Sequence, residues 1–133
     1  MELQKISSDI LQKSKNLIKQ QKYRQAEKLL LSLKDSNGES WQIFWQLGIA
    51  TQNQNKWEDS YKYLKKALKF NPDSFQSYNE LGLLFQKQKN YKRAIQYFKR
   101  AIQIKSNYFA AYFNLGNTLK SAGKYDLALN SYK

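Results

Sequence analysis

Hydrophobic residues recur along this chain at spacings of three and four positions, which is the periodicity of amphipathic helices. Stripes of this kind come in consecutive pairs. The clearest second stripe of a pair consists of Tyr91, Ala94, Ile95, Phe98, Ala101 and Ile102. Turn-forming residues interrupt the pattern near 54–55, 71–73, 89–90, 105–107 and 123–124. The pattern therefore predicts a series of helical hairpins without strands.

The same residue classes return every 34 positions. If the first repeat starts at residue 7, the seventeenth position of every repeat is aromatic, at Tyr23, Trp57, Tyr91 and Tyr125. Small residues occupy two further positions, at Gly48, Gly82 and Gly116 and at Ala26, Ser60, Ala94 and Ala128. A period of this length is typical of stacked helical arrays, in which such residues let neighbouring helices approach closely. We expect these residues to form the core of four repeats at about 7–40, 41–74, 75–108 and 109–133, the last one truncated.

Three stretches in register carry a family resemblance. Phe44-Trp45-Gln46-Leu47-Gly48, Tyr78-Asn79-Glu80-Leu81-Gly82 and Tyr112-Phe113-Asn114-Leu115-Gly116 are each followed by the aromatic and small residues described above. The chain resembles a tetratricopeptide repeat (TPR) protein over about residues 7–133, and its fourth repeat is similar to repeats of O-GlcNAc-transferase-type proteins. The resemblance implies an all-α fold, a right-handed α-solenoid of TPR helical hairpins.

The two ends of the array depart from the family pattern. In the first repeat Lys13 replaces a leucine, Leu33 replaces a small residue, and Gly38 stands where proline is common. We expect a true but divergent end repeat. At the other end the chain stops at Lys133, inside the expected second helix of the fourth repeat, and no polar capping helix follows. We therefore expect these residues, a single TPR array over 1–133, to be the N-terminal part of a longer protein.

The composition offers little for catalysis. Histidine and cysteine are absent, which removes the commonest zinc ligands and any Ser-His or Cys-His nucleophile. The glycines are single and form no phosphate-binding loop. We expect no enzyme, no cofactor and no metal within these residues. The N-terminus lacks a basic segment followed by an apolar one, and no apolar run is long enough to cross a membrane. We expect a cytoplasmic protein that does not insert into membranes.

The resemblance also implies a binding surface. In TPR proteins the first helix of each hairpin lines a concave groove, with five of its positions pointing inward. The groove residues that we predict are Gln42, Trp45, Ile49, Gln52, Gln76, Asn79, Leu83, Gln86, Phe113, Asn117 and Lys120. Amides can bond to a peptide backbone, while Trp45 and Phe113 can act as apolar anchors. Alternatively, Trp45 packs against a neighbouring first helix and the amides are solvated.

Some TPR proteins hold the acidic C-termini of chaperones in a clamp of Lys, Asn and Arg. Neither possible register of this chain reproduces that clamp. The prediction is therefore a non-catalytic scaffold that binds a peptide or a partner domain in the groove. The first alternative is a substrate-recruiting arm of a larger enzyme, a glycosyltransferase, sulfotransferase or methyltransferase, whose catalytic domain lies beyond residue 133. Self-association through the exposed end of the solenoid is a further hypothesis.

The second alternative comes from the charge. The formal net charge is +13, which suits a polyanion partner. However, Lys outnumbers Arg 20 to 3, and Arg is the better residue for bidentate phosphate contacts. The second helices are expected to carry the basic residues on the convex side, at Lys62, Lys65, Lys66, Lys69, Lys92, Arg93, Lys99 and Arg100. We favour compositional drift as the explanation of the excess, so we expect only nonspecific nucleic-acid binding at low salt.

Overall fold

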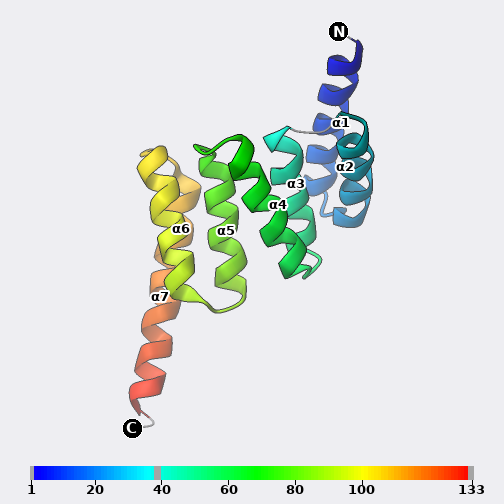
Figure 1. The fold of residues 1–133 in the computed structure, drawn as a ribbon. Coiled ribbons are helices and arrows are strands. Elements are labelled where there is room, and N and C mark those ends of the chain that lie inside the picture. Colours follow the sequence, from blue (N-terminus) through cyan, green and yellow to red (C-terminus); the bar gives the residue numbers. More distant parts are fainter. Residues whose placement is uncertain (1, 38–39, 132–133) are drawn as a thin grey trace. The chain divides into compact units, whose positions relative to one another are not determined.

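The computed structural model describes the backbone of residues 2–37 and 40–131, and the side chains of residues 7–33 and 40–124. The described residues form seven α-helices and no strand, which confirms the predicted all-α fold (Figure 1). The helices are α1 (Glu2–Lys19), α2 (Tyr23–Asn37), α3 (Trp41–Gln52), α4 (Trp57–Phe70), α5 (Phe75–Lys87), α6 (Tyr91–Ile104) and α7 (Phe109–Ser131).

The chain divides into two compact parts, which are described separately. The N-terminal part, Met1–Asp73, contains the hairpins α1–α2 and α3–α4. The C-terminal part, Ser74–Lys133, contains the hairpin α5–α6 followed by α7. Consecutive helices pack against each other in both parts, and first helices also contact each other, α1 with α3 and α5 with α7.

The turn inside each hairpin has one recurring backbone geometry. Gln21, Asn55 and Lys89, which are 34 residues apart, have positive φ angles of 61°, 62° and 62°. The amide of the next residue donates to the carbonyl five residues earlier, at N···O distances of 2.8, 3.0 and 2.9 Å. This is the Schellman arrangement, which ends a helix with one residue in the left-handed conformation. The predicted breaks near 54–55 and 89–90 are thereby confirmed.

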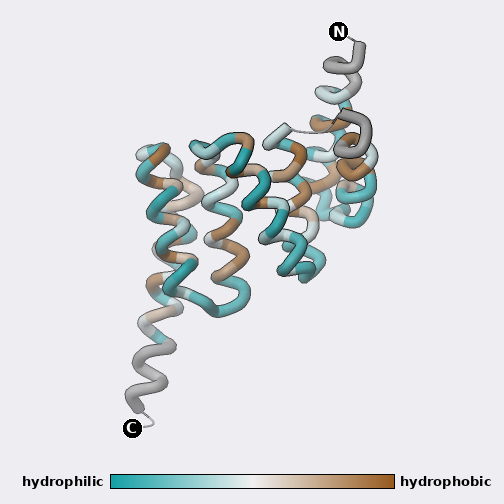
Figure 2. Tube along the Cα trace, viewed as in Figure 1, coloured by the Kyte–Doolittle hydropathy of each residue, from teal (hydrophilic) through white to brown (hydrophobic). Residues whose placement is uncertain are grey.

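The core of the N-terminal part forms where α2, α3 and α4 meet. Figure 2 shows apolar residues recurring along each helix with hydrophilic residues between them. The buried cluster consists of Leu30, Leu33, Ile43, Phe44, Leu47 and Ala67. Complete burial of one such large side chain contributes about 1.5–3 kcal/mol. Leu30 and Leu33 come from the first repeat, so this divergent repeat is an integral part of the core.

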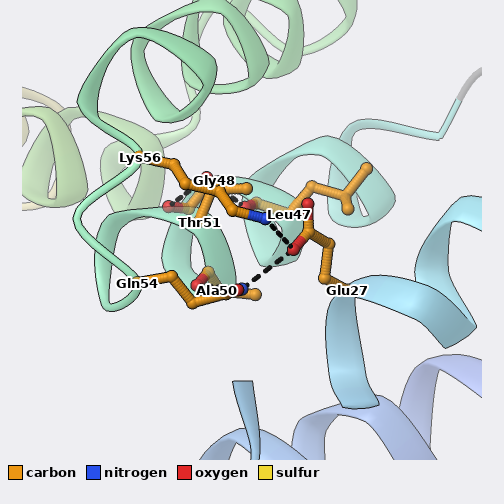
Figure 3. Close-up of polar contacts among 7 residues, drawn as sticks. All are labelled: Glu27, Leu47, Gly48, Ala50, Thr51, Gln54 and Lys56. Atoms are coloured by element: carbon orange, nitrogen blue, oxygen red, sulfur yellow. Dashed lines mark hydrogen bonds and ion pairs between the residues drawn. The ribbon is translucent and has the colours of Figure 1, made fainter. Parts of the chain in front are cut away.

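Polar contacts also join the first and second repeats. Glu27 of α2 accepts hydrogen bonds from Gln54 Nε2 and Lys56 Nζ, each at 2.9 Å (Figure 3). Glu27 is largely buried, whereas Lys56 remains partly exposed. Both donors lie at the turn of the second hairpin. This carboxylate therefore fixes the end of one hairpin against the next.

Small residues are placed as the sequence predicts. A Cβ atom added to Gly48 would lie 2.4 Å from Leu64 Cδ2, so a side chain there would require Leu64 to shift. Ser60 is fully buried and donates to the carbonyl of Gly48 at 2.8 Å. Ala26 and Ala94, in the same register as Ser60, are also fully buried. The predicted core residues Tyr125 and Ala128 lie outside the described side chains.

The predicted break at Gly123-Lys124 is wrong. α7 continues as one helix from Phe109 to Ser131, through the position that is equivalent to Lys89. In the complete hairpins the helix ends because the next helix packs back against it. A Cβ added to Gly116 would meet nothing within 4 Å, so no such packing occurs among the described side chains of this repeat. Uninterrupted helical hydrogen bonds then outweigh the cost of about 1 kcal/mol for a glycine inside a helix.

Candidate binding surfaces

The predicted groove residues fall on two surfaces, one in each part of the chain. In the N-terminal part they lie on α3, beside α1. In the C-terminal part they lie on α5 and α7, which contact each other. Each surface is a seam, by which we mean the contact between the first helices of two hairpins. The chemistry of the surface depends on which side chains take part in that contact and which remain exposed.

Trp45 belongs to the seam between α1 and α3. It is half-buried against the hydrophobic core, and its ring centroid lies 5.9 Å from that of Trp41. Its indole Nε1 is buried and has no hydrogen-bond acceptor among the described residues. These contacts are with its own helix and with the core, and the alternative that Trp45 packs against a neighbouring first helix stays a prediction. An indole N–H buried without an acceptor is uncommon in folded proteins, where nearly all such groups find a partner.

The other predicted residues of α3 differ in exposure. Gln42 is exposed and Ile49 is half-buried. Gln52, also predicted as a groove residue, is only 1% exposed, which leaves almost none of its side chain accessible to a ligand. Gln46, which the sequence did not single out, is the residue of α3 that forms hydrogen bonds with α1. It accepts a hydrogen bond from Ser14 of α1, and its Nε2 donates to the carbonyl of Leu11 at 3.4 Å.

The seam between α5 and α7 contains two side-chain hydrogen bonds. Asn114 Nδ2 donates to Asn79 Oδ1 at 3.1 Å, and Gln86 Nε2 donates to Thr118 Oγ1 at 2.7 Å. Thr118 in turn donates to the carbonyl of Asn114 at 2.7 Å. Asn79 is only 4% exposed and accepts this hydrogen bond, so little of its side chain remains for a ligand. These amides hold the helices together because buried polar groups require partners.

Three predicted residues of α7 are exposed beside this seam. Phe113 is 70% exposed, and Asn117 and Lys120 are exposed as well. Their spacing of four and three residues puts them on one face of the helix. Gln76 and Leu83 of α5 are half-buried. We call Phe113, Asn117, Lys120, Leu83 and Gln76 the α5–α7 surface.

Glu80 is an electrostatic feature of α5 that the sequence did not reveal. Burial raises the pKa of Glu80 to about 7, although nearby Lys87 lowers it. Burial also lowers the pKa of Lys87, against the effect of Glu80. The pKa of Tyr108 is raised by burial and then by the Glu80 charge. Glu80 occupies the same repeat position as Gln46 and Asn114, and both of these residues form hydrogen bonds to the preceding first helix. This shared position is the sequence signal that could have identified Glu80.

The basic residues of the second helices are exposed, but several of them also contact aromatic rings. Lys66 Nζ lies 4.7 Å from the centroid of Phe44, and Arg93 lies 4.3 Å from that of Phe85. Arg100 lies 5.8 Å from the ring of Tyr78. Such cation–π contacts contribute about 0.5–1 kcal/mol at exposed sites. Part of the basic surface therefore has a structural role in covering the first helices.

The described residues also bear on other kinds of site. Within the described ranges, no three His, Cys, Asp or Glu side chains come together as a metal site would require. None of the helices described combines the length and the apolar character of a membrane span. A hollow of about 400 Å³ lies between α1 and α2, outside the predicted groove. It is lined by Lys13, Leu17, Gln25, Lys28, Leu29 and Ser32.

The hairpins, their repeating turns and the small residues between their helices define a helical repeat protein. Family models confirm the class. Models described as "Tetratricopeptide repeat" match residues 75–108 and 97–130, and one described as "TPR repeat" matches residues 53–89. Together they span residues 53–130. The chain belongs to the tetratricopeptide repeat family.

Solved structures show the same fold. MamA is 21% identical, with a TM-score of 0.76 over 93% of this chain and 72% of that chain. The second TPR domain of human RPAP3, solved with an HSP70 peptide, is 14% identical, with a TM-score of 0.75 over 87% and 97% of the two chains. A mutant O-GlcNAc transferase of Thermobaculum terrenum is 13% identical, with a TM-score of 0.84 over 90% of this chain and 23% of that one. These identities establish likeness of fold alone. No curated protein sequence matches significantly.

Proposed function

We propose that this chain is a non-catalytic scaffold that binds an extended peptide segment of a partner protein on the α5–α7 surface. The observation that carries the proposal is Phe113, an aromatic side chain that is 70% exposed beside a hydrogen-bonded seam. Exposed aromatic residues on a rigid support are typical anchors of protein interfaces. Membership of the TPR family and the peptide complex of the human RPAP3 domain support this function.

The residues around Phe113 indicate the chemistry of the ligand. Asn117 is exposed and has both a donor and an acceptor to offer to a peptide backbone. Lys120 of α7 is an exposed cation, which favours an acidic residue in the peptide. The peptide would therefore place an apolar side chain against Phe113 and an acidic one near Lys120. This differs from a chaperone clamp, whose residues the chain lacks.

The rigidity of the seam makes the surface suitable for binding. Asn79, Gln86, Asn114 and Thr118 are bonded to one another across α5 and α7, so they do not reorganise when a peptide arrives. A preorganised surface loses less conformational entropy on binding. The predicted groove thus separates into bonded amides that form the support and three α7 residues that contact the ligand.

Selection from a random peptide library, followed by titration calorimetry of the selected peptides, tests this proposal. Phe113→Ala is expected to weaken binding by about tenfold or more, as loss of an anchor does. Asn117→Ala is expected to weaken it less. Tyr112→Ala is the matched control, because Tyr112 is an exposed aromatic residue on a different face of the same helix. Selected peptides that bind Phe113→Ala as tightly as the parent would refute this site.

A further inference from the structure

The hollow between α1 and α2 belongs to neither of the two binding surfaces described above. Its volume of about 400 Å³ lies within the range of protein ligand sites. Leu17 of α1 and Leu29 of α2 provide its apolar lining, and both side chains are half-buried. Lys13 and Lys28 line it with exposed cations, one from each helix. The hollow therefore combines an apolar patch with two positive charges.

These residues come from one face of each helix. Lys13 and Leu17 stand four residues apart on α1, which puts them on the same side. The lining residues of α2 have the spacing i, i+3, i+4, i+7 of a single face, at Gln25, Lys28, Leu29 and Ser32. Leu30 and Leu33, which enter the core, lie about a third of a turn around α2 from that face. α2 therefore has a second face, separate from its core face, that lines the hollow.

The second repeat shows what covers the equivalent place there. The residues of α3 that correspond to Lys13 and Leu17 are Leu47 and Thr51, and both are 0% exposed. The preceding second helix, α2, packs against α3, and its Leu30 shares a core cluster with Leu47. Among the described residues, α1 contacts only α2 and α3, so no helix lies over the same positions of the first repeat. The shape of the open place is therefore suited to a helix.

Lys13 determines which kind of helix fits this place. The same repeat position holds leucine in the other repeats, at Leu47, Leu81 and Leu115. A helix lying over Lys13 would remove water from its ammonium group, which costs free energy unless a carboxylate pairs with it. Neither Lys13 nor Lys28 is paired with an acidic side chain of the described residues. The charges therefore favour a covering helix that has acidic residues beside its apolar stripe.

We propose that the open face of the first hairpin, formed by Lys13, Leu17, Lys28 and Leu29, binds an acidic amphipathic helix of a partner protein. Apolar side chains of that helix enter the hollow, and its carboxylates pair with the two lysines. A second copy of this chain does not suit the face, because its own net charge of +13 would repel the lysines. The face lies in the N-terminal part of the chain, so the inference is independent of the α5–α7 surface and its extended peptide.

Selection from a library of helical peptides, against the 133-residue chain at physiological salt, tests the inference. The stripe positions of the library hold Leu, Ile, Phe or Met, and the flanking positions hold Glu, Gln or Lys. Glu should be enriched at the flanks of the selected peptides. A peptide with the same composition in scrambled order, which has the charge without the stripe, should bind about tenfold more weakly. No selected helix, no preference for Glu, or equal binding of the scrambled peptide would overturn the inference.

Two double variants separate this face from the general positive charge of the chain. Lys13→Glu with Lys28→Glu should weaken the selected peptides by about tenfold or more, and a repeated selection should then favour Lys at the flanks. The matched control is Lys15→Glu with Lys19→Glu, because these exposed lysines lie on the opposite side of α1 and the change in net charge is the same. Equal losses for the two double variants would mean that only net charge attracts the peptide, and would overturn the inference.

Photo-crosslinking then locates the bound helix. A selected peptide that carries a benzophenone side chain in its apolar stripe should crosslink to α1 and α2, as mass spectrometry of the digested product shows. Leu17→Gln should reduce both the crosslinking and the affinity by about tenfold, because the apolar lining of the hollow is then smaller. Circular dichroism checks that this variant keeps the helices of the parent. Crosslinks to α5 or α7 alone, or a folded Leu17→Gln chain that binds like the parent, would overturn the inference.

Discussion

Gly82 of α5 faces the ring of Phe98 of α6 so closely that a Cβ atom on Gly82 would lie 2.4 Å from Phe98 Cε1. Phe98 is fully buried, so its ring has no free space to move into. Gly48 and Leu64 have the same relationship one repeat earlier. In these two hairpins the glycine therefore avoids a clash with the large residue opposite it. Gly116 has no such neighbour in the described structure.

This difference predicts opposite effects for one substitution at two equivalent positions. Gly82→Leu should force α5 and α6 apart and lower the free energy of unfolding by about 1–3 kcal/mol, as overpacking does. Gly116→Leu should be neutral or stabilising in the monomer by up to about 1 kcal/mol, because leucine favours the helix more than glycine. Urea unfolding at low protein concentration measures both. Equal destabilisation of the two variants would mean that Gly116 is also covered within one chain.

Glu80 predicts an unusual dependence of stability on pH. Its pKa in the folded protein is about 7, above the ordinary value of 4.5, so the folded state binds more protons between these values. Stability should therefore fall as the pH rises from about 4.5 to 7, by about 1–2 kcal/mol when partial solvent contact is allowed for. Histidine is absent from the chain, so its usual titration in this range does not interfere.

The matched variant is Glu80→Gln, which keeps the shape of the side chain and removes the ionisation. Glu80→Gln should abolish most of the fall in stability between about pH 4.5 and 7. The variant should also be more stable than the parent at about pH 8, because no charge is then buried. Urea unfolding at about pH 5 and pH 8 gives the comparison. A parent and variant with parallel pH profiles would show that Glu80 titrates normally in the folded protein.

Glu27 predicts that the first two repeats are coupled energetically. It accepts hydrogen bonds from Gln54 and Lys56, both at 2.9 Å, and is largely buried. Glu27→Ala should therefore cost about 1–2 kcal/mol. A double-mutant cycle with Lys56→Ala should give a coupling of about 0.5–1 kcal/mol.

The control for this cycle is the pair Glu58 and Lys62 on α4. Lys62 Nζ lies 3.4 Å from Glu58 Oε1, and both side chains are strongly exposed. Exposed pairs of this kind contribute little, and the coupling should be about 0–0.5 kcal/mol. If the two cycles gave equal couplings, the burial of Glu27 would contribute nothing to the contact between the repeats.

The sequence predicted the complete hairpins because their signals are local and repeated. The expected starts of the repeats at residues 41, 75 and 109 are the first residues of α3, α5 and α7. The breaks near Asn55 and Lys89 were correct as well. The break near Gly123 was wrong, although glycine suits a left-handed residue better than Asn55 or Lys89. A helix ends where packing of the next helix makes the turn favourable, and that packing is not encoded at the turn itself.

The groove was predicted less well than the fold. The inward-pointing positions of the family predicted Phe113, Asn117 and Lys120 as groove residues, and their side chains are exposed in the structure. It could not show that Asn79 is bonded to Asn114, or Gln86 to Thr118, because those pairs are 35 and 32 residues apart. Their spacing differs from the 34-residue period, so comparing equivalent positions does not reveal them. Such contacts depend on how neighbouring helices are offset along their axes.

The basic second helices predict weak, salt-sensitive binding of nucleic acid. Lys66, Arg93 and Arg100 already contact aromatic rings, and both arginines of α4 and α6, the better residues for bidentate phosphate contacts, are among these three. Binding should arise mainly from counterion release, so affinity should fall steeply as salt rises, without preference for sequence. Fluorescence anisotropy with unrelated single-stranded and duplex oligonucleotides, at low and physiological salt, measures this. Lys62→Gln with Lys69→Gln should reduce the salt slope by about 2 if both lysines contact phosphates. Tight, sequence-selective binding at physiological salt would instead make nucleic acid the principal partner.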